Sequence, residues 1–328
     1  VKLADNITIV TWGDMISGSN YYYKNNDYET VEVILDLPGW WVRPQIASID
    51  DEYHVNLFSA TFESVYKKQV SINFTTNQNN YEDTEFLFDD PDMNMNETFT
   101  YKVNSSGNGA IVKAIHNQII VNKINNFNNL LDSDTVIIDE QNFPILEGLI
   151  DVNSHGIQNY GLTYLVSETG MQHFIFDYVM IYEEGFSILG LHLKKDYSIQ
   201  EDWSLSIIDS SNFSNWDQFG NMDYWVGLQS SASMSSENEE HLWFVNQTYR
   251  DNWIDINVMK SEDGGDSWNH FISIDEDTLD GRGKFIHSPE YSTNSELVFV
   301  YQILESSFTA DYLSDNWIIK TCRIGGAV

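Results

Sequence analysis

The sequence is poor in cysteine and in basic residues, and each shortage excludes a class of protein. Cys322 is the only cysteine among 328 residues, so a scaffold held by intramolecular disulfides is excluded. Sixteen Lys and Arg residues stand against 50 Asp and Glu residues, which gives a formal net charge of −34. This charge repels phosphate groups and argues against nucleic-acid partners. No apolar run approaches the roughly 18 residues of a membrane-spanning helix, so we expect no membrane insertion.

The acidic bias also bears on location and on cofactors. Basic residues are scarce, which favours an extracellular or cell-surface setting rich in salt or calcium, although solubility alone is a second explanation. The first residue is Val1. We therefore expect an upstream segment, such as a signal peptide, to have been removed, and residues 1–328 to be a domain cut from a longer secreted chain. Calcium is the one cofactor that the abundance of carboxylates favours.

Two acidic clusters are candidate calcium sites. The better one contains Asp275, Asp277 and Asp280, and the other contains Asp89, Asp90 and Asp92. Neither matches the 12-residue helical calcium loop, and a solvated acidic loop is the alternative at both places. The eight histidines show no H-x-x-x-H spacing, so a transition-metal centre is not expected.

Alternation of apolar and polar residues runs through the chain and predicts an all-β protein. It is clear over Asn6–Trp12, Thr30–Leu37 and Tyr53–Phe58. Loops rich in Asn, Asp, Ser and Gly separate these runs, and the chain has only 5 prolines. No segment has the composition of a long flexible linker, so the sequence predicts one domain over residues 1–328.

A weak internal repeat refines the fold prediction. Each unit is a strand, a loop and a second strand, and the units begin at Asn6, Glu52, Gly109, Tyr160, Glu240 and Glu296. Such spacing is typical of one four-stranded blade per repeat, which predicts a six-bladed β-propeller. A seven-bladed propeller and a pair of β-sandwiches are the alternatives. The interval between Tyr160 and Glu240 is too wide for one unit, so either Asp209–Asp223 is an insertion or Phe186–Ile208 belongs to another blade.

One motif is specific. Residues 261–268 read S-E-D-G-G-D-S-W, which matches the S-x-D-x-G-x-S-W pattern through Ser261, Asp263, Gly265, Ser267 and Trp268. The motif lies between the expected strands Trp253–Lys260 and Asn269–Ile274. A turn of this kind lets the carboxylate of Asp263 accept hydrogen bonds from its own loop and uses a positive φ at Gly265. The indole of Trp268 is expected to pack between neighbouring sheets.

This motif resembles the Asp box of sialidase-like propellers, the BNR-repeat proteins. The resemblance covers the unit from Glu240 to Ile274, and one intact box is present. It implies a β-propeller fold in which the box is a structural element at the edge of a blade, remote from the central pocket. The motif therefore supports the fold and says little about the activity.

Sialidases hold the substrate carboxylate with three arginines, so the same resemblance supplies weak catalytic candidates. Arg43, which precedes Pro44, resembles the early arginine of that family, and Arg250, Arg282 and Arg323 could complete a triad. No residue among 18 tyrosines is identified as a nucleophile, and 50 acidic residues make a carboxylate pair uninformative. Whether the chain is an enzyme stays open, and an enzyme would be a glycoside hydrolase.

Two further sets of residues are compatible with contact to glycans. Aromatic residues cluster at Tyr21–Tyr23, at Trp40 and Trp41, and at Tyr224 and Trp225, where blade packing is the alternative to sugar stacking. Sequons for N-glycosylation start at Asn6, Asn73, Asn96, Asn104, Asn212 and Asn246.

The sequence thus favours an extracellular or cell-surface β-propeller that acts as a binding or structural module for a glycan or a surface protein. A glycoside-cleaving enzyme and a subunit of a surface layer or filament are the alternatives.

Overall fold

The computed structural model describes strands from every part of the chain. It describes residues 2–4, 7–14, 18–25, 31–37, 45–49, 54–60, 64–73, 78–81, 85–89, 98–125, 129–150, 156–157, 162–181, 186–197, 202–213, 230–250, 253–274, 285–286, 291–305 and 316–325. The described residues are all-β apart from one 3-10 turn at Pro144–Leu146, as the alternating sequence predicts. None of them forms a helix long and apolar enough to cross a membrane.

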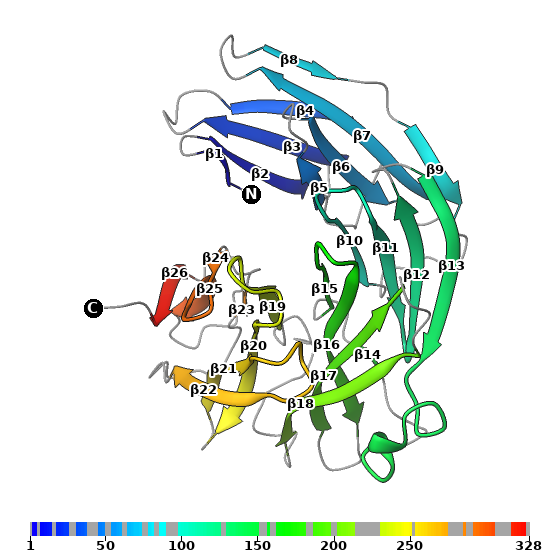
Figure 1. The fold of residues 1–328 in the computed structure, drawn as a ribbon. Coiled ribbons are helices and arrows are strands. Elements are labelled where there is room, and N and C mark those ends of the chain that lie inside the picture. The colour runs from blue at the N-terminus through cyan, green and yellow to red at the C-terminus, as the bar shows by residue number, and fades with distance from the viewer. Residues whose placement is uncertain are drawn as a thin grey trace. The chain divides into compact units, whose positions relative to one another are not determined.

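The described strands form six antiparallel sheets, here called A to F in chain order (Figure 1). Sheet A contains β1 (Lys2–Ala4), β2 (Ile7–Asp14), β3 (Gly18–Asn25) and β4 (Val31–Leu37). Sheet B contains β5 (Gln45–Ile49), β6 (His54–Ala60), β7 (Ser64–Asn73), β8 (Gln78–Tyr81) and β9 (Glu85–Asp89). Sheet C contains β10 (Thr98–Val103), β11 (Gly109–Ile115), β12 (Gln118–Asn125) and β13 (Asn129–Ile137).

The other three sheets follow the same plan. Sheet D contains β14 (Gly156–Ile157), β15 (Thr163–Val166), β16 (Met171–Ile181), β17 (Phe186–Asp196) and β18 (Ser204–Phe213). Sheet E contains β19 (Ser231–Met234), β20 (Leu242–Arg250), β21 (Trp253–Ser261) and β22 (Asn269–Ile274). Sheet F contains β23 (Phe285–Ile286), β24 (Tyr291–Ser292), β25 (Glu296–Glu305) and β26 (Asn316–Gly325).

Each of the six repeat starts lies in or just before a different sheet, so the repeat in the sequence corresponds to the sheets. The wide interval after Tyr160 has a simple cause. Phe186–Asp196 is the long strand β17 and pairs with β16 over its whole length, and β18 pairs with β17. The suggestion that Phe186–Ile208 belongs to another blade is therefore wrong, because these residues complete sheet D.

By its internal contacts the chain divides into two compact units, and the division passes through sheet C. One unit contains residues 1–113 and 121–134, and the other contains residues 114–120 and 135–328. That residues 1–328 make one propeller domain stays a prediction.

Within the second unit, sheet E is packed on both faces because the residues of β20 alternate between two cores. Trp243 and Val245 join Phe299 and Tyr301 of sheet F in one buried cluster. Leu242 and Phe244 join Leu165, Ile175 and Ile208 of sheet D in another cluster, which also contains Ala232 and Met259 of sheet E. A central strand that is apolar on both faces fits a sheet stacked between two others. Burial of each large side chain contributes about 1.5–3 kcal/mol to the free energy of unfolding.

Candidate functional site

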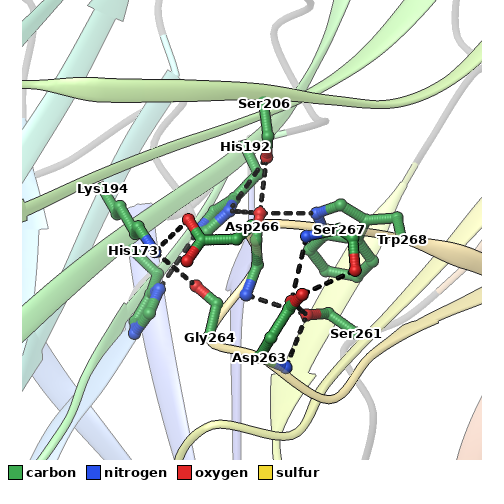
Figure 2. Close-up of polar contacts among 11 residues, drawn as sticks. His173, His192, Lys194, Ser206, Ser261, Asp263, Gly264, Asp266, Ser267 and Trp268 are labelled. Atoms are coloured by element: carbon green, nitrogen blue, oxygen red, sulfur yellow. Dashed lines mark hydrogen bonds and ion pairs between the residues drawn. The ribbon is translucent and has the colours of Figure 1, made fainter.

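The loop that joins β21 to β22 makes a dense polar network (Figure 2). Ser261 ends β21, and its hydroxyl donates to Asp263 Oδ1 at 2.8 Å while it accepts from the amide of Gly265 at 2.8 Å. Ser267 donates its amide to Asp263 Oδ1 at 2.9 Å and its hydroxyl to Oδ2 at 2.6 Å. The loop is therefore closed around one carboxylate.

The hydrogen bonds within the loop set the protonation state of Asp263. Desolvation alone would raise the pKa of its carboxyl group, but hydrogen bonds from Ser267, Ser261 and the amide of Asp266 together outweigh it. They lower the pKa to about 2, so the group is a carboxylate at neutral pH. A carboxylate that accepts several hydrogen bonds is stabilised in its charged form. Asp263 thus acts as the acceptor that organises the loop.

Replacing Asp263 by Asn should destabilise the protein by about 1–2 kcal/mol, because an amide cannot accept at both of its heavy atoms. Urea unfolding at pH 7 measures this change. Asp266→Asn is the matched control, because it removes the exposed ion pair between Asp266 and Lys194 (2.6 Å) and should cost less than about 1 kcal/mol. Equal losses in the two variants would show that Asp263 does not organise the loop.

The same loop is fastened to sheet D. The carbonyl of Gly265 accepts hydrogen bonds from the hydroxyl of Ser206 at 2.6 Å, from Nδ1 of His192 at 3.1 Å and from the indole of Trp268 at 3.2 Å. Lys194 donates to the carbonyl of Gly264 at 3.3 Å. Figure 2 shows His192 and Lys194 of β17 and Ser206 of β18 reaching the loop, so the loop of sheet E closes against the neighbouring sheet.

Behind the loop lies a buried histidine pair, His173 and His192. Nδ1 of His173 and Nε2 of His192 are 3.0 Å apart, and the two side chains are 2% and 1% exposed. Because Nδ1 of His192 donates to a carbonyl, its Nε2 has to accept, so His173 is the donor of the bond between the rings. Both nitrogens of His192 are used in this way.

Burial keeps the histidine pair uncharged. It is the largest of the effects that lower the pKa of His173 to about 3, and electrostatic repulsion of a proton by the neighbouring His192 and Lys194 adds to it. Burial also lowers the pKa of His192 to about 4, against a raising effect of its bond to Gly265. Both rings are neutral at physiological pH, so neither offers the titration near pH 7 that general acid–base catalysis requires. The pair therefore has a structural role: His173 bonds to His192, and His192 bonds to the β21–β22 loop.

A second buried polar region lies between sheets D and E. Asp177 is 3% exposed. Burial raises the pKa of its carboxyl group to about 7, against the lowering effect of a hydrogen bond from Ser230, and the charge of Asp209 raises it further. Asp209 accepts a hydrogen bond at Oδ2 from Asn257 of sheet E at 2.9 Å. A raised carboxyl pKa beside a second carboxylate is typical of glycosidase acids, but substrate cannot reach a side chain buried this deeply.

A partly exposed aromatic pair lies at the β17–β18 end of sheet D. The rings of Tyr197 and Trp203 meet edge to face with centroids 6.0 Å apart. Nζ of Lys195 lies 5.1 Å from the centroid of Tyr197 and 4.8 Å from that of Trp203. Neither ring is fully buried, so the pair could stack on a sugar while the ammonium group donates to its hydroxyls.

The part of the chain that the structure describes does not show the four candidate clamp arginines close together. Arg43 and Arg282 lie outside them, and Arg250 ends β20 with a side chain that is also outside them. Arg323 of β26 forms an ion pair with Glu296 of β25. The arginine clamp stays a prediction.

Most residues of the two candidate calcium clusters also lie outside the described residues. Asp89 ends β9, whereas the others lie outside the described residues, namely Asp90, Asp92, Asp275, Asp277 and Asp280. Among the described residues, no group of three or more His, Cys, Asp or Glu side chains is placed to hold a metal ion. Of the aromatic clusters, Tyr21–Tyr23 belongs to β3 and the other two are outside.

Two of the six sequons have described side chains, and both are buried. Asn104 is 7% exposed, and its Oδ1 accepts from the amides of Ser106 at 3.1 Å and Asn108 at 3.0 Å. Asn246 is 3% exposed. A glycan on either side chain would not fit the folded packing, so we do not expect glycosylation there. The prediction remains for the other four, Asn6, Asn73, Asn96 and Asn212.

Comparison with known proteins assigns no family. No family model matches, and no curated protein matches. Solved structures with a similar course of the chain include polysaccharide lyase Uly1, at 8% identity over 95% of this chain and 71% of that chain, with a TM-score of 0.44. The catalytic domain of Coprinopsis cinerea GH62 α-L-arabinofuranosidase has 12% identity over 97% and 96%, with a TM-score of 0.40.

An endo-arabinase from Bacteroides thetaiotaomicron has 8% identity over 100% of this chain and 92% of that chain, with a TM-score of 0.38. Likeness at this level assigns neither an activity nor a substrate to the chain.

Proposed function

We propose that the chain is a six-bladed β-propeller of the Asp-box class that acts as an extracellular or cell-surface binding or structural module. The supporting observation is the use made of the β21–β22 loop. The carbonyls of Gly264 and Gly265 accept hydrogen bonds from β17 and β18 of sheet D, while the carboxylate of Asp263 holds the loop itself in shape. The histidine pair lies behind the loop and positions His192 for its bond to Gly265. Such a network gives a rigid scaffold, and function on a rigid scaffold resides in the surfaces that it presents.

A glycan is the partner that the described surface favours. Tyr197 and Trp203 present partly exposed rings beside an ammonium group, and the chain's charge of −34 suits a neutral sugar better than an anionic one. A surface protein is the second partner class. A glycoside hydrolase is the alternative function, and it would have to use residues such as Arg43 and Arg282.

A glycan array probed with the fluorescently labelled protein tests this proposal. We expect retention of neutral glycans, and Trp203→Ala should weaken it by about threefold to tenfold, which corresponds to the loss of one aromatic contact. Phe271→Ala is the matched control, because this ring is 44% exposed on β22 and lies in another sheet. No retention of any glycan, or equal retention by both variants, would contradict the glycan assignment.

A panel of fluorogenic glycosides at several pH values tests the alternative. The proposal expects no turnover. Turnover that is lost in Arg43→Ala would establish a glycoside hydrolase and overturn the binding-module proposal.

A further inference from the structure

Two buried side-chain oxygen atoms in the region around Asp177 have no hydrogen-bond partner. We call Asp177, Asp209, Asn246 and Asn257 the inter-sheet polar layer. The first two belong to sheet D and the other two to sheet E. The layer takes no part in the β21–β22 loop or in the glycan surface proposed above, so its chemistry needs its own explanation.

Strand register places the four side chains on two facing surfaces. Asp177 is paired across β16 and β17 with Gly190, and Gly190 is paired across β17 and β18 with Asp209. Directly opposed residues of neighbouring strands project from the same face of a sheet. A Cβ atom added to Gly190 would meet the ring of Phe244 at 3.1 Å, so this face is turned toward sheet E. The two aspartates therefore flank a glycine on the face that meets sheet E.

Sheet E presents amide groups to the same region. Asn246 is paired with Asn257 across β20 and β21, so their side chains also share a face. Asn257 donates from Nδ2 to Asp209 Oδ2 at 2.9 Å, and its own Oδ1 accepts from the hydroxyl of Ser273 at 3.2 Å. The hydrogen bond to Asp209 joins the two faces. The ring of Phe244, two residues before Asn246, bounds the layer on its apolar side.

Two acceptors in the layer have no hydrogen-bond donor. Oδ1 of Asp177 and Oδ1 of Asn246 are buried without a partner, and each side chain is 3% exposed. An unsatisfied buried polar group costs about 1–3 kcal/mol. Asp177 is removed from water, whereas Asp209 is half-buried and its Oδ1 accepts from the amide of Ser210 at 2.8 Å. Desolvation of Asp177 and the negative charge of Asp209 beside it both disfavour a second carboxylate charge here. A positive group that accepts oxygen ligands would relieve both costs.

We propose that the inter-sheet polar layer binds one calcium ion between sheets D and E, with Asp177, Asp209 and Asn246 as side-chain ligands. The donors are carboxylate and amide oxygens, which are the ligands that Ca²⁺ prefers in proteins. Ca²⁺ also tolerates irregular geometry, and water and backbone carbonyls commonly complete its shell of six to eight oxygens. Mg²⁺ demands a near-ideal octahedron and dehydrates reluctantly, so an irregular site in which two of the three side-chain ligands, Asp177 and Asn246, are buried suits it less well.

Thermal unfolding of the full chain, first stripped of metal with a chelator and then titrated with CaCl₂ at pH 7.5 and 0.15 M NaCl, tests the proposal. We expect 1 mM Ca²⁺ to raise the Tm by several degrees, and calorimetric titration to show a site that Asp177→Asn weakens at least tenfold. Asn has the size of Asp but lacks the charge. Asp266→Asn removes an exposed carboxylate (side chain 66% exposed) and should respond to Ca²⁺ as the unaltered chain does. NaCl at equal ionic strength and MgCl₂ control for general screening of the charge of −34.

Two outcomes would overturn the proposal. One is a Tm that rises no more with CaCl₂ than with NaCl of equal ionic strength. The other is an Asp177→Asn variant whose calcium titration equals that of the unaltered chain, which would move any calcium to another cluster such as Asp275, Asp277 and Asp280. Should Asp177→Asn fail to fold, Asn246→Asp replaces it as the test. This variant adds a charged ligand and is expected to bind Ca²⁺ more tightly, and weaker or equal binding would contradict the assignment.

Discussion

Gly265→Ala is expected to destabilise the protein by about 2–5 kcal/mol. Gly265 has a φ of +86°, a conformation that costs an L side chain about 1–2 kcal/mol. A Cβ atom there would also lie 2.0 Å from Cε1 of His192, so the buried ring would have to move. Forced repacking of a filled interior typically costs a further 1–3 kcal/mol or so. Urea unfolding at pH 7.5 measures the loss.

Gly264→Ala is the matched control because the two glycines are adjacent and both have a positive φ. Gly264 has a φ of +67°, but the nearest atom to an added Cβ would be Nζ of Lys194 at 4.0 Å. This variant should therefore lose only the backbone term of about 1–2 kcal/mol. Similar losses in the two variants would mean that contact between the loop and His192 contributes little to stability.

The protein should also become less stable as the pH falls from 6.5 toward 4, because of the histidine pair. In the unfolded chain both rings take up protons near pH 6.5. In the folded chain burial lowers the pKa of His173 to about 3 and that of His192 to about 4. The unfolded state thus binds up to two more protons in this window, and the contribution of the pair is full above pH 6.5 and is lost as the pH falls.

The expected size is about 1.4 kcal/mol per pH unit for each ring, so the pair contributes a loss on the order of 3 kcal/mol between pH 6.5 and 5. Asp177 works in the opposite direction in metal-free protein, because its folded pKa is raised to about 7. Its stabilising contribution is full below the unfolded pKa of about 4 and is lost as the pH rises through 7.

The pair is isolated by comparing the unaltered chain with a variant in which His173 and His192 are both replaced by Gln. The difference between the two unfolding free energies, measured in urea from pH 8 to 5, should shrink or reverse as the pH falls. Asp177 is common to both chains and cancels. A difference that does not change with pH would show that the rings are not held neutral by folding.

The fold and the candidate site differ in how far the sequence could predict them. The alternating run Tyr53–Phe58 falls on β6 from His54 onward, and the strand expected at Trp253–Lys260 lies in β21. The loop at Ser261–Trp268 was visible because its hydrogen bonds join residues no more than four positions apart. Hydrogen bonds between residues this close in the chain can be predicted from a short sequence motif.

The histidine pair was not visible, because its contacts depend on strand pairing and on the approach of another sheet. His173 meets His192 through the β16–β17 register, and His192 meets Gly265 at a separation of 73 residues. His173 and His192 are 19 residues apart, which matches no short metal-binding spacing of histidines. The register of a long hairpin at residues 171–196 is the signal that could have placed the two rings near one another.

The inter-sheet polar layer was hidden for the same reason. Asp177 and Asp209 are two of 50 acidic residues. Asp177 stands in the apolar run Phe174–Ile181, which indicates a buried strand, but nothing in the sequence places Asp209 or Asn246 beside it. These residues are brought together by the register of β16, β17 and β18 and by the packing of sheet E against sheet D.

The carbonyl of Gly265 has a consequence for how the protein opens. It receives donors from β17, from β18 and from its own loop, so no one of these segments can leave without breaking bonds of the others. Local fluctuations that release the loop therefore also break its hydrogen bonds to β17 and β18 of sheet D. The two sheets form one cooperative unit of native-state opening, and the slowest amide hydrogens to exchange in β17 and β21 should report a common opening free energy.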